Sequence, residues 1–89
     1  MYDFPIRPGG RSQALLPAQA MFLELSQVFR GLEPGRVDGL HTGASVRNVL
    51  WHQRMLNRPQ TAALDGPLFF SLSHLPHLTR RFLGEESRP

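Results

Sequence analysis

The chain has 89 residues, enough for one domain, and it has no cysteine for a disulfide or a thiolate metal site. A domain of this size has a marginal free energy of unfolding, and we expect ordinary hydrophobic packing to stabilise it. No apolar run approaches the roughly 20 residues of a membrane span, and Asp3 and Pro5 fall where a signal peptide needs its apolar core. We therefore expect a cytoplasmic protein that makes no membrane contact.

Proline and glycine are frequent in residues 1–12, which show no helical period and predict an extended or mobile arm. The periodic segments that follow predict a single helical domain over 13–84, and residues 85–89 are expected to form a frayed tail. The fold class that we predict is all-α, a compact bundle of three to five helices.

The strongest predicted element is a helix of about four turns over 17–32. Pro17 suits the first helical position, where its missing N–H group costs nothing. Polar residues, among them Gln19, lie on one side of this helix, and the glycines and proline of 31–35 are expected to end it. The apolar residues opposite fall within an arc of about 120° at 100° per residue; they are Ala18, Met21, Phe22, Leu25, Val28, Phe29 and Leu32. We expect Phe22 and Leu25 to be deeply buried.

A second helix is predicted over 44–57, where Thr42 or Ser45 can cap the first turn. The segment 57–59 ends it, because the residue before a proline avoids the α region. A short helix is predicted to follow over 59–64. The buried face of the second helix is expected to consist of Val46, Val49, Leu50 and Leu56, with Gln53 in the same sector.

The last third of the chain fits two patterns. Residues 68–73 alternate apolar and serine side chains, which predicts a short strand, whereas the apolar residues of 69–75 recur with a helical period. We favour a helix, because a lone strand has no obvious partner apart from the N-terminal arm. A last helix is predicted to begin at Pro76.

The net charge of +3 is concentrated in residues 41–64, because the acids and bases of the flanking segments balance. All ten basic residues are arginine, whose planar guanidinium groups bind phosphates, carboxylates and aromatic rings. On the second helix, four residues fall within about 60° of one another; they are Arg47, Trp51, Arg54 and Arg58. We predict that this Arg/Trp stripe, which holds the chain's one tryptophan, is a partner-binding surface.

Three functions fit such a stripe. The one that we favour is a non-catalytic regulatory or adaptor module that binds a larger protein, since tryptophan and arginine often anchor protein interfaces. The first alternative is a small nucleic-acid-binding regulator, in which guanidinium groups contact phosphates and the indole stacks on a base. The second alternative is a structural subunit of a homo-oligomer. If Trp51 instead folds back into the core, the arginines form a solvated face over its ring.

No metal or cofactor is predicted. His74 and His77 are three residues apart, but Pro76 sits between them, and His41 and His52 lie elsewhere in the chain. None of these histidines has a recognised metal-ligand spacing. We expect the protein to fold without a metal ion.

Catalysis is not predicted either. The segment 39–45 precedes a helix, but it lacks the Gly-Lys-Ser/Thr ending of a phosphate loop. The residues Asp65, Ser71, Ser73 and His74 include the side chains of a hydrolase triad, but they lack a nucleophile-elbow motif. A domain this small does not easily enclose a water-excluded pocket. We therefore expect a protein that is not an enzyme.

Overall fold

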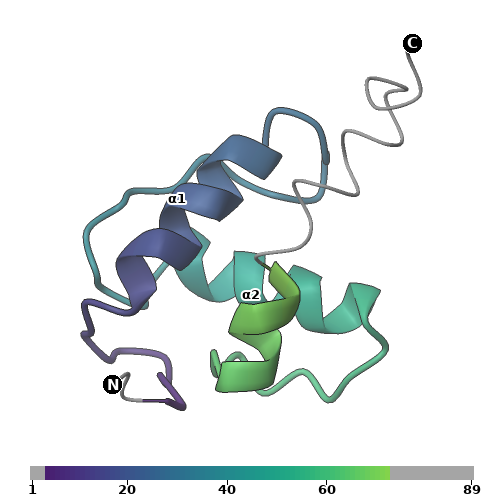
Figure 1. Ribbon diagram of the computed structural model, residues 1–89. Helices are drawn as coiled ribbons and strands as arrows, with labels where there is room; N and C mark the ends of the chain where they lie inside the picture. The colour runs from purple at the N-terminus through teal and green to yellow at the C-terminus, as the bar shows by residue number, and fades with distance from the viewer. Residues whose placement is uncertain (1–3, 73–89) are drawn as a thin grey trace, which may run out of the picture.

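The computed structural model describes residues 4–72, which form three helices and no sheet (Figure 1). Helix α1 spans Leu15–Leu25, helix α2 spans Ala44–Met55, and the described part of a third helix covers 66–72. The predicted helical fold is therefore confirmed for this part of the chain.

The segment after α2 differs from two expectations. Residues 59–64 contain no helix, so the short helix predicted there is wrong. Polar side chains bind the backbone of this segment and hold it in an irregular path. Residues 66–72 are helical, which excludes the alternative strand over 68–73 for the residues that the structure describes. The helix predicted from Pro76 lies outside the described residues.

Helix α1 is shorter than the predicted helix over 17–32. It begins two residues before Pro17 and ends at Leu25. Immediately after this end, the Ser26 hydroxyl donates a hydrogen bond to the Leu23 carbonyl at 2.6 Å. A serine side chain that binds a nearby carbonyl offers the backbone an alternative to the helical pattern. The chain turns there, well before the predicted stop.

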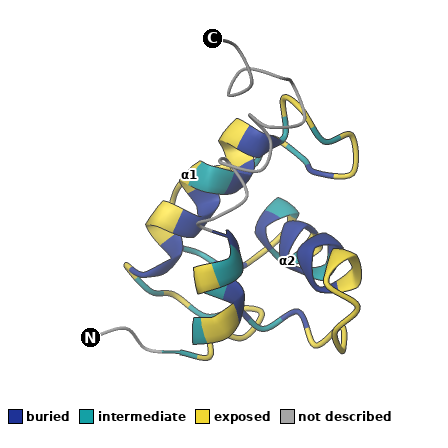
Figure 2. Ribbon diagram, turned by 45° about the vertical axis from the view of Figure 1, so that its right-hand side comes forward, coloured by how far each residue is buried: buried dark blue, intermediate teal, exposed yellow. Residues whose placement is uncertain are grey.

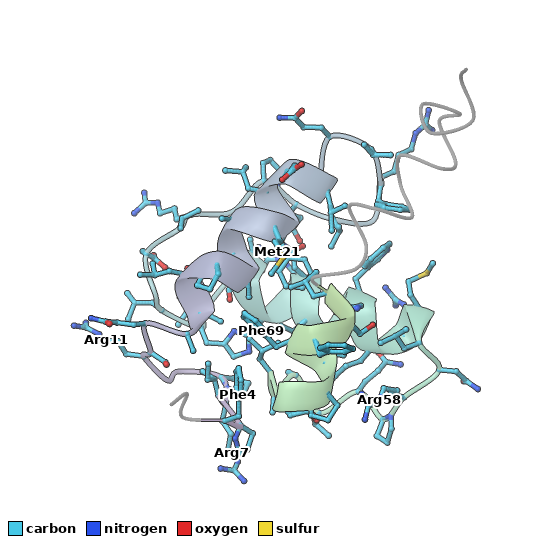
Figure 3. All side chains as sticks on the ribbon, viewed as in Figure 1. Phe4, Arg7, Arg11, Met21, Arg58 and Phe69 are labelled. Carbon is cyan, nitrogen blue, oxygen red and sulfur yellow. The ribbon has the colours of Figure 1, made fainter. Side chains whose placement is uncertain are left out.

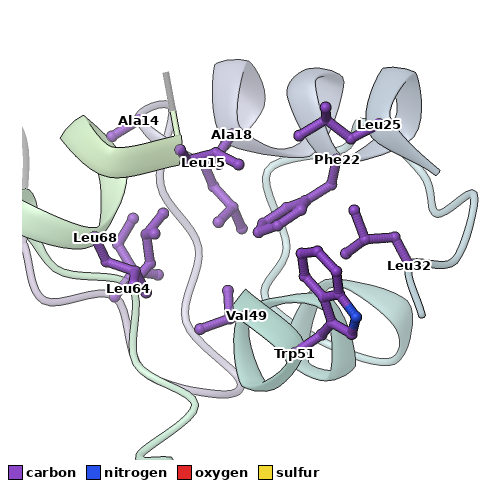
Figure 4. Packing of buried hydrophobic residues seen from close by; sticks show 12 residues of the cluster. Ala14, Leu15, Ala18, Phe22, Leu25, Leu32, Val49, Trp51, Leu64 and Leu68 are labelled. Atoms are coloured by element: carbon purple, nitrogen blue, oxygen red, sulfur yellow. The ribbon is translucent and has the colours of Figure 1, made fainter. Parts of the chain in front are cut away.

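The core lies between the three helices and takes residues from the helices and from the segments that connect them (Figure 4). Phe22 and Leu25 are each 2% exposed, which confirms their predicted burial. Val28 was expected on the same face and is instead exposed, because α1 ends before it. The buried cluster consists of Ile6, Ala14, Leu15, Ala18, Phe22, Leu25, Leu32, Val49, Trp51, Leu64, Leu68 and Leu72.

The described part of the N-terminal arm contributes to this core. Ile6 is buried and forms an isolated antiparallel bridge with Leu64, with N···O distances of 2.7 and 2.9 Å. Arg11 forms a second antiparallel bridge with Leu40. The arm is therefore attached to two different loops of the domain.

Buried amide side chains tie the loops to the helices. Gln19 is buried, although its place opposite the apolar arc predicts an exposed side chain. Its Nε2 donates to the Leu40 carbonyl at 2.9 Å, and its Oε1 accepts from the backbone N–H groups of Asp38 and Gly39 at 2.9 and 2.8 Å. Burial of this amide is favourable because its polar atoms are hydrogen-bonded. Two further buried amides, those of Asn48 and Gln53, hold other loops in the same way.

Replacing Gln19 with leucine is expected to lower the free energy of unfolding by about 1–3 kcal/mol, because the N–H groups of Asp38 and Gly39 lose their partner. Gln27 is exposed, so Gln27→Leu is a matched control that we expect to change stability by no more than about 0.5 kcal/mol. Urea denaturation followed by circular dichroism measures both variants. Wild-type stability of Gln19→Leu would contradict its anchoring role.

Candidate functional site

The Arg/Trp stripe does not form one exposed surface, because the indole of Trp51 lies in the core. Trp51 is 9% exposed, and its ring centroid is 5.4 Å from that of Phe29. Figure 4 shows the indole beside Leu32 and Phe22. A Cβ atom at Gly31 would lie 2.0 Å from the indole Nε1, so the loop backbone packs directly on the ring. The expectation of an exposed tryptophan is wrong, and the alternative of a core tryptophan is confirmed.

Polar residues explain why α2 is turned differently from the prediction. The helix buries Ser45, Asn48, Val49, Trp51, His52 and Gln53. At 100° per residue, the centre of this arc lies roughly 100° from the centre of the apolar face that was predicted. Val46 and Leu50 of the predicted face are only half-buried, and Leu56 is exposed. Apolar periodicity alone therefore selects the wrong face of this helix.

Arg47 is paired with an acid of the loop before α2. Its guanidinium donates two hydrogen bonds to the Glu33 carboxylate, from Nε at 2.5 Å and from Nη2 at 2.9 Å. These hydrogen bonds lower the pKa of Glu33 and raise the pKa of Arg47. The Asn48 side chain fixes the same loop, because it bonds both the N–H and the carbonyl of Glu33 at 2.9 Å. Arg47 is thus one half of a surface ion pair.

The C-terminal end of α2 holds the exposed arginines of the predicted stripe that form no ion pair within the described residues (Figure 2). Arg54 and Arg58 are both exposed. Between them, Met55 and Leu56 are 61% and 38% exposed. We call these four residues the α2 end. Two cations and two apolar side chains are therefore exposed within five residues where the helix stops.

A hydrogen-bonded turn fixes the backbone of the α2 end. Asn57 adopts a left-handed conformation with a φ of 56°, and its N–H donates to the Arg54 carbonyl at 3.1 Å. The N–H of Arg58 donates to the Gln53 carbonyl at 2.9 Å. This pair of bonds is a Schellman motif, in which a left-handed residue beyond the C-cap closes the helix. The helix ends within two residues of the predicted end.

The two described histidines are core residues. The Nε2 of His41 lies 2.5 Å from the Ala62 carbonyl oxygen, and its Nδ1 lies 2.8 Å from the Ser45 hydroxyl. A carbonyl only accepts, so Nε2 carries the proton and Nδ1 accepts from the serine. His52 packs edge-on against the ring of Phe22, and no partner in the described part of the chain bonds its two ring nitrogens. Residues 4–72 hold no cluster of three potential metal ligands.

Burial lowers the pKa of both histidines. For His52, burial and, to a smaller extent, the charge of Arg58 lower the pKa to about 4. For His41, burial lowers the pKa, and the hydrogen bond to Ala62 opposes this shift. Both rings are therefore neutral at pH 7.

The residues considered for catalysis are only partly described. Asp65 caps the helix over 66–72, where its Oδ1 accepts the Leu68 N–H at 2.7 Å. Ser71 lies within that helix, whereas Ser73 and His74 lie outside the described residues.

Of the helices that the structure describes, none has the length and apolar character needed to cross a membrane. Comparison of the chain with protein-family models, with curated proteins and with solved structures found no match in any of the three.

Proposed function

We propose that the protein is a non-catalytic regulatory or adaptor module that binds a larger protein through the α2 end. The observation that carries this proposal is the exposure of Arg54 and Arg58 around two exposed apolar side chains. No acid occurs in residues 41–64, so the α2 end carries two positive charges and no negative charge of its own. Arginine and methionine are both enriched in protein interfaces.

The partner that fits the α2 end carries carboxylates around an apolar contact. A guanidinium binds a carboxylate with two parallel hydrogen bonds, which gives both affinity and orientation. The flexible side chain of Met55 adapts its shape to an apolar surface. The Schellman turn holds the Arg58 backbone before binding, which reduces the conformational entropy that association costs.

Burial of Trp51 favours a protein partner over a nucleic acid. Proteins that bind single strands offer exposed aromatic rings on which bases stack, and the ring of the predicted stripe is in the core. Arg47 is also paired with Glu33. The arginines that remain at the α2 end are few compared with the roughly 6–10 phosphate contacts of strong DNA binders.

Reversing the charges of the α2 end tests the proposal. Tagged wild-type protein and the variant Arg54→Glu/Arg58→Glu are used to capture partners from the organism that encodes the chain, with and without nuclease. We expect the wild type to retain a protein partner after nuclease treatment and the variant to lose it. Arg11→Glu/Arg36→Glu changes the net charge equally at two other exposed sites and is the matched control.

The fold of the double variant is checked separately. Arg54 lies in the last turn of α2, where a glutamate loses a favourable interaction with the helix dipole, so that reversal is expected to cost about 1 kcal/mol. This loss is small enough for the variant to keep a wild-type circular dichroism spectrum. Retention of the partner by the α2-end variant, or equal loss in the control, would contradict the proposal. A partner that nuclease removes would favour the nucleic-acid alternative.

A further inference from the structure

A cavity of about 600 Å³ lies between the N-terminal arm and the loop before the third helix. It is lined by Phe4, Pro5, Arg7 and Pro8 of the arm and by Thr61 and Asp65 of the loop, among others. Sites for small molecules have volumes of roughly 300–1,000 Å³ and combine apolar walls with a few polar groups. We propose that this cavity binds a free α-amino acid with an apolar side chain.

Buried contacts hold the loop wall of the cavity in place. Leu64 is bridged to Ile6 of the arm. The Ala62 N–H donates to Gln53 Oε1 at 3.0 Å, and the Ala62 carbonyl accepts from His41 at 2.5 Å. These bonds hold Ala62 at a φ of 65°, a left-handed conformation that is unfavourable for a residue with a Cβ atom. The bonds to Ala62 therefore fix the backbone between Thr61 and Ala63, two residues that line the cavity.

Two side chains of opposite charge line the cavity without pairing with each other. In the described part of the chain the one salt bridge joins Arg47 and Glu33, so the Arg7 guanidinium and the Asp65 carboxylate are beyond salt-bridge distance. Asp65 uses Oδ1 to cap the third helix, which leaves Oδ2 for a ligand. The amino acid that we propose would place its carboxylate at Arg7 and its ammonium group at Asp65.

Thr61 adds a hydrogen-bond donor to this arrangement. Its Oγ1 accepts from Gln53 Nε2 at 3.0 Å and from the Ala63 N–H at 3.2 Å. Both acceptor positions of the hydroxyl are therefore used, and its hydrogen is left to donate to a further group. The carboxylate of an amino acid is an acceptor of this kind.

The arm supplies an apolar surface. This surface favours an amino acid with an apolar side chain over one with a polar side chain. The rings of Phe4 and Phe69 pack at a centroid distance of 5.5 Å (Figure 3), and Pro5 and Pro8 extend the apolar wall. The amino-acid site shares no residue with the α2 end, although Thr61 and Asp65 of its wall also line a smaller hollow together with Arg58. Its test changes Arg7 and Asp65 and leaves Arg54 and Arg58 in place, so the two proposals fail separately.

Titration of the full chain with L-phenylalanine and L-leucine, followed by calorimetry, tests the proposal. N-acetyl-L-phenylalanine lacks the ammonium group and L-phenylalaninamide lacks the carboxylate, and we expect each to bind at least about tenfold more weakly than L-phenylalanine. The variants Arg7→Gln and Asp65→Asn remove one charge each, and asparagine preserves the helix cap. Arg11→Gln is the matched control on the arm.

Each variant is expected to lose the preference for L-phenylalanine over one of its two derivatives. Asp65→Asn should bind L-phenylalanine no better than its N-acetyl derivative, and Arg7→Gln should bind it no better than the amide. The control should retain wild-type affinity for all three ligands. The proposal is overturned by the absence of saturable binding of both amino acids, by equal affinity for the three phenylalanine ligands, or by unchanged affinities in both variants.

Discussion

Replacing Trp51 with alanine is expected to lower the free energy of unfolding by about 3–5 kcal/mol, because the indole belongs to the core. The substitution removes the ring that packs against Phe29 and beneath the backbone of Gly31. Small domains are only marginally stable, so we expect much of this variant to be unfolded in the absence of denaturant. Urea denaturation followed by circular dichroism measures the loss. Wild-type stability would show that the indole is outside the core.

A methyl group at Gly31 tests the same contact independently. The added Cβ would lie 2.0 Å from Nε1 and 2.3 Å from Cδ1 of the indole, so the loop or the ring must move. We expect Gly31→Ala to cost about 1–3 kcal/mol and to shift the emission of Trp51, which is the only tryptophan. In combination with Trp51→Leu, most of the Gly31→Ala penalty should disappear. Strictly additive effects of the two substitutions would contradict the contact.

Acidification is expected to destabilise the fold through His52. Its pKa is about 4 in the folded protein and 6.5 in the unfolded chain, so the unfolded state binds more protons between these values. The contribution of His52 to stability is therefore complete above about pH 6.5 and decreases as the pH falls towards 4. From these values we expect a loss of about 2 kcal/mol between roughly pH 7.5 and pH 5. The lowered pKa of His41 acts in the same direction.

The variant His52→Phe isolates this effect. Phenylalanine cannot be protonated and has a ring that can pack beside Phe22, so the variant should lose about 2 kcal/mol less than the wild type over the same pH interval. Glu33 and Asp38 also have shifted pKa values, but both are lowered and titrate below this interval. Urea denaturation at the two pH values measures the difference. Identical pH dependence of variant and wild type would contradict the burial of a neutral His52.

The approximate positions of α1 and α2 could be predicted from the sequence, because their apolar residues recur with a helical period, whereas the helix predicted over 59–64 is absent. Phe22, Leu25 and Val49 lie in the core as predicted. The length of α1 could not be predicted in this way. Ser26 contributes to the end of the helix through a local hydrogen bond, and Leu32 reaches the core from a loop although its spacing matches the helix. An apolar period indicates which residues are buried, but it does not show that their backbone is helical.

The orientation of α2 could not be predicted, because polar contacts with distant loops determine it. Asn48 and Gln53 are buried where they bond to the backbone of other segments, and no period of apolar residues registers such bonds. The buried face predicted from apolar residues alone therefore places Trp51 on the exposed side of the helix. Arg54 and Arg58 lie outside both the predicted and the observed buried arc, so their predicted exposure did not depend on which arc was chosen.

The proposal that the α2 end binds a protein is tested most directly by site-specific photo-crosslinking. A photo-reactive phenylalanine derivative replaces Met55 or, as a control, Val37, which is exposed in a loop elsewhere. The protein is irradiated in cells of the organism that encodes it. We expect position 55, and not position 37, to give a nuclease-resistant adduct with a different protein. No adduct at position 55, an adduct that nuclease removes, an adduct with the mass of two copies of this chain, or equal adducts at both positions would contradict the proposal.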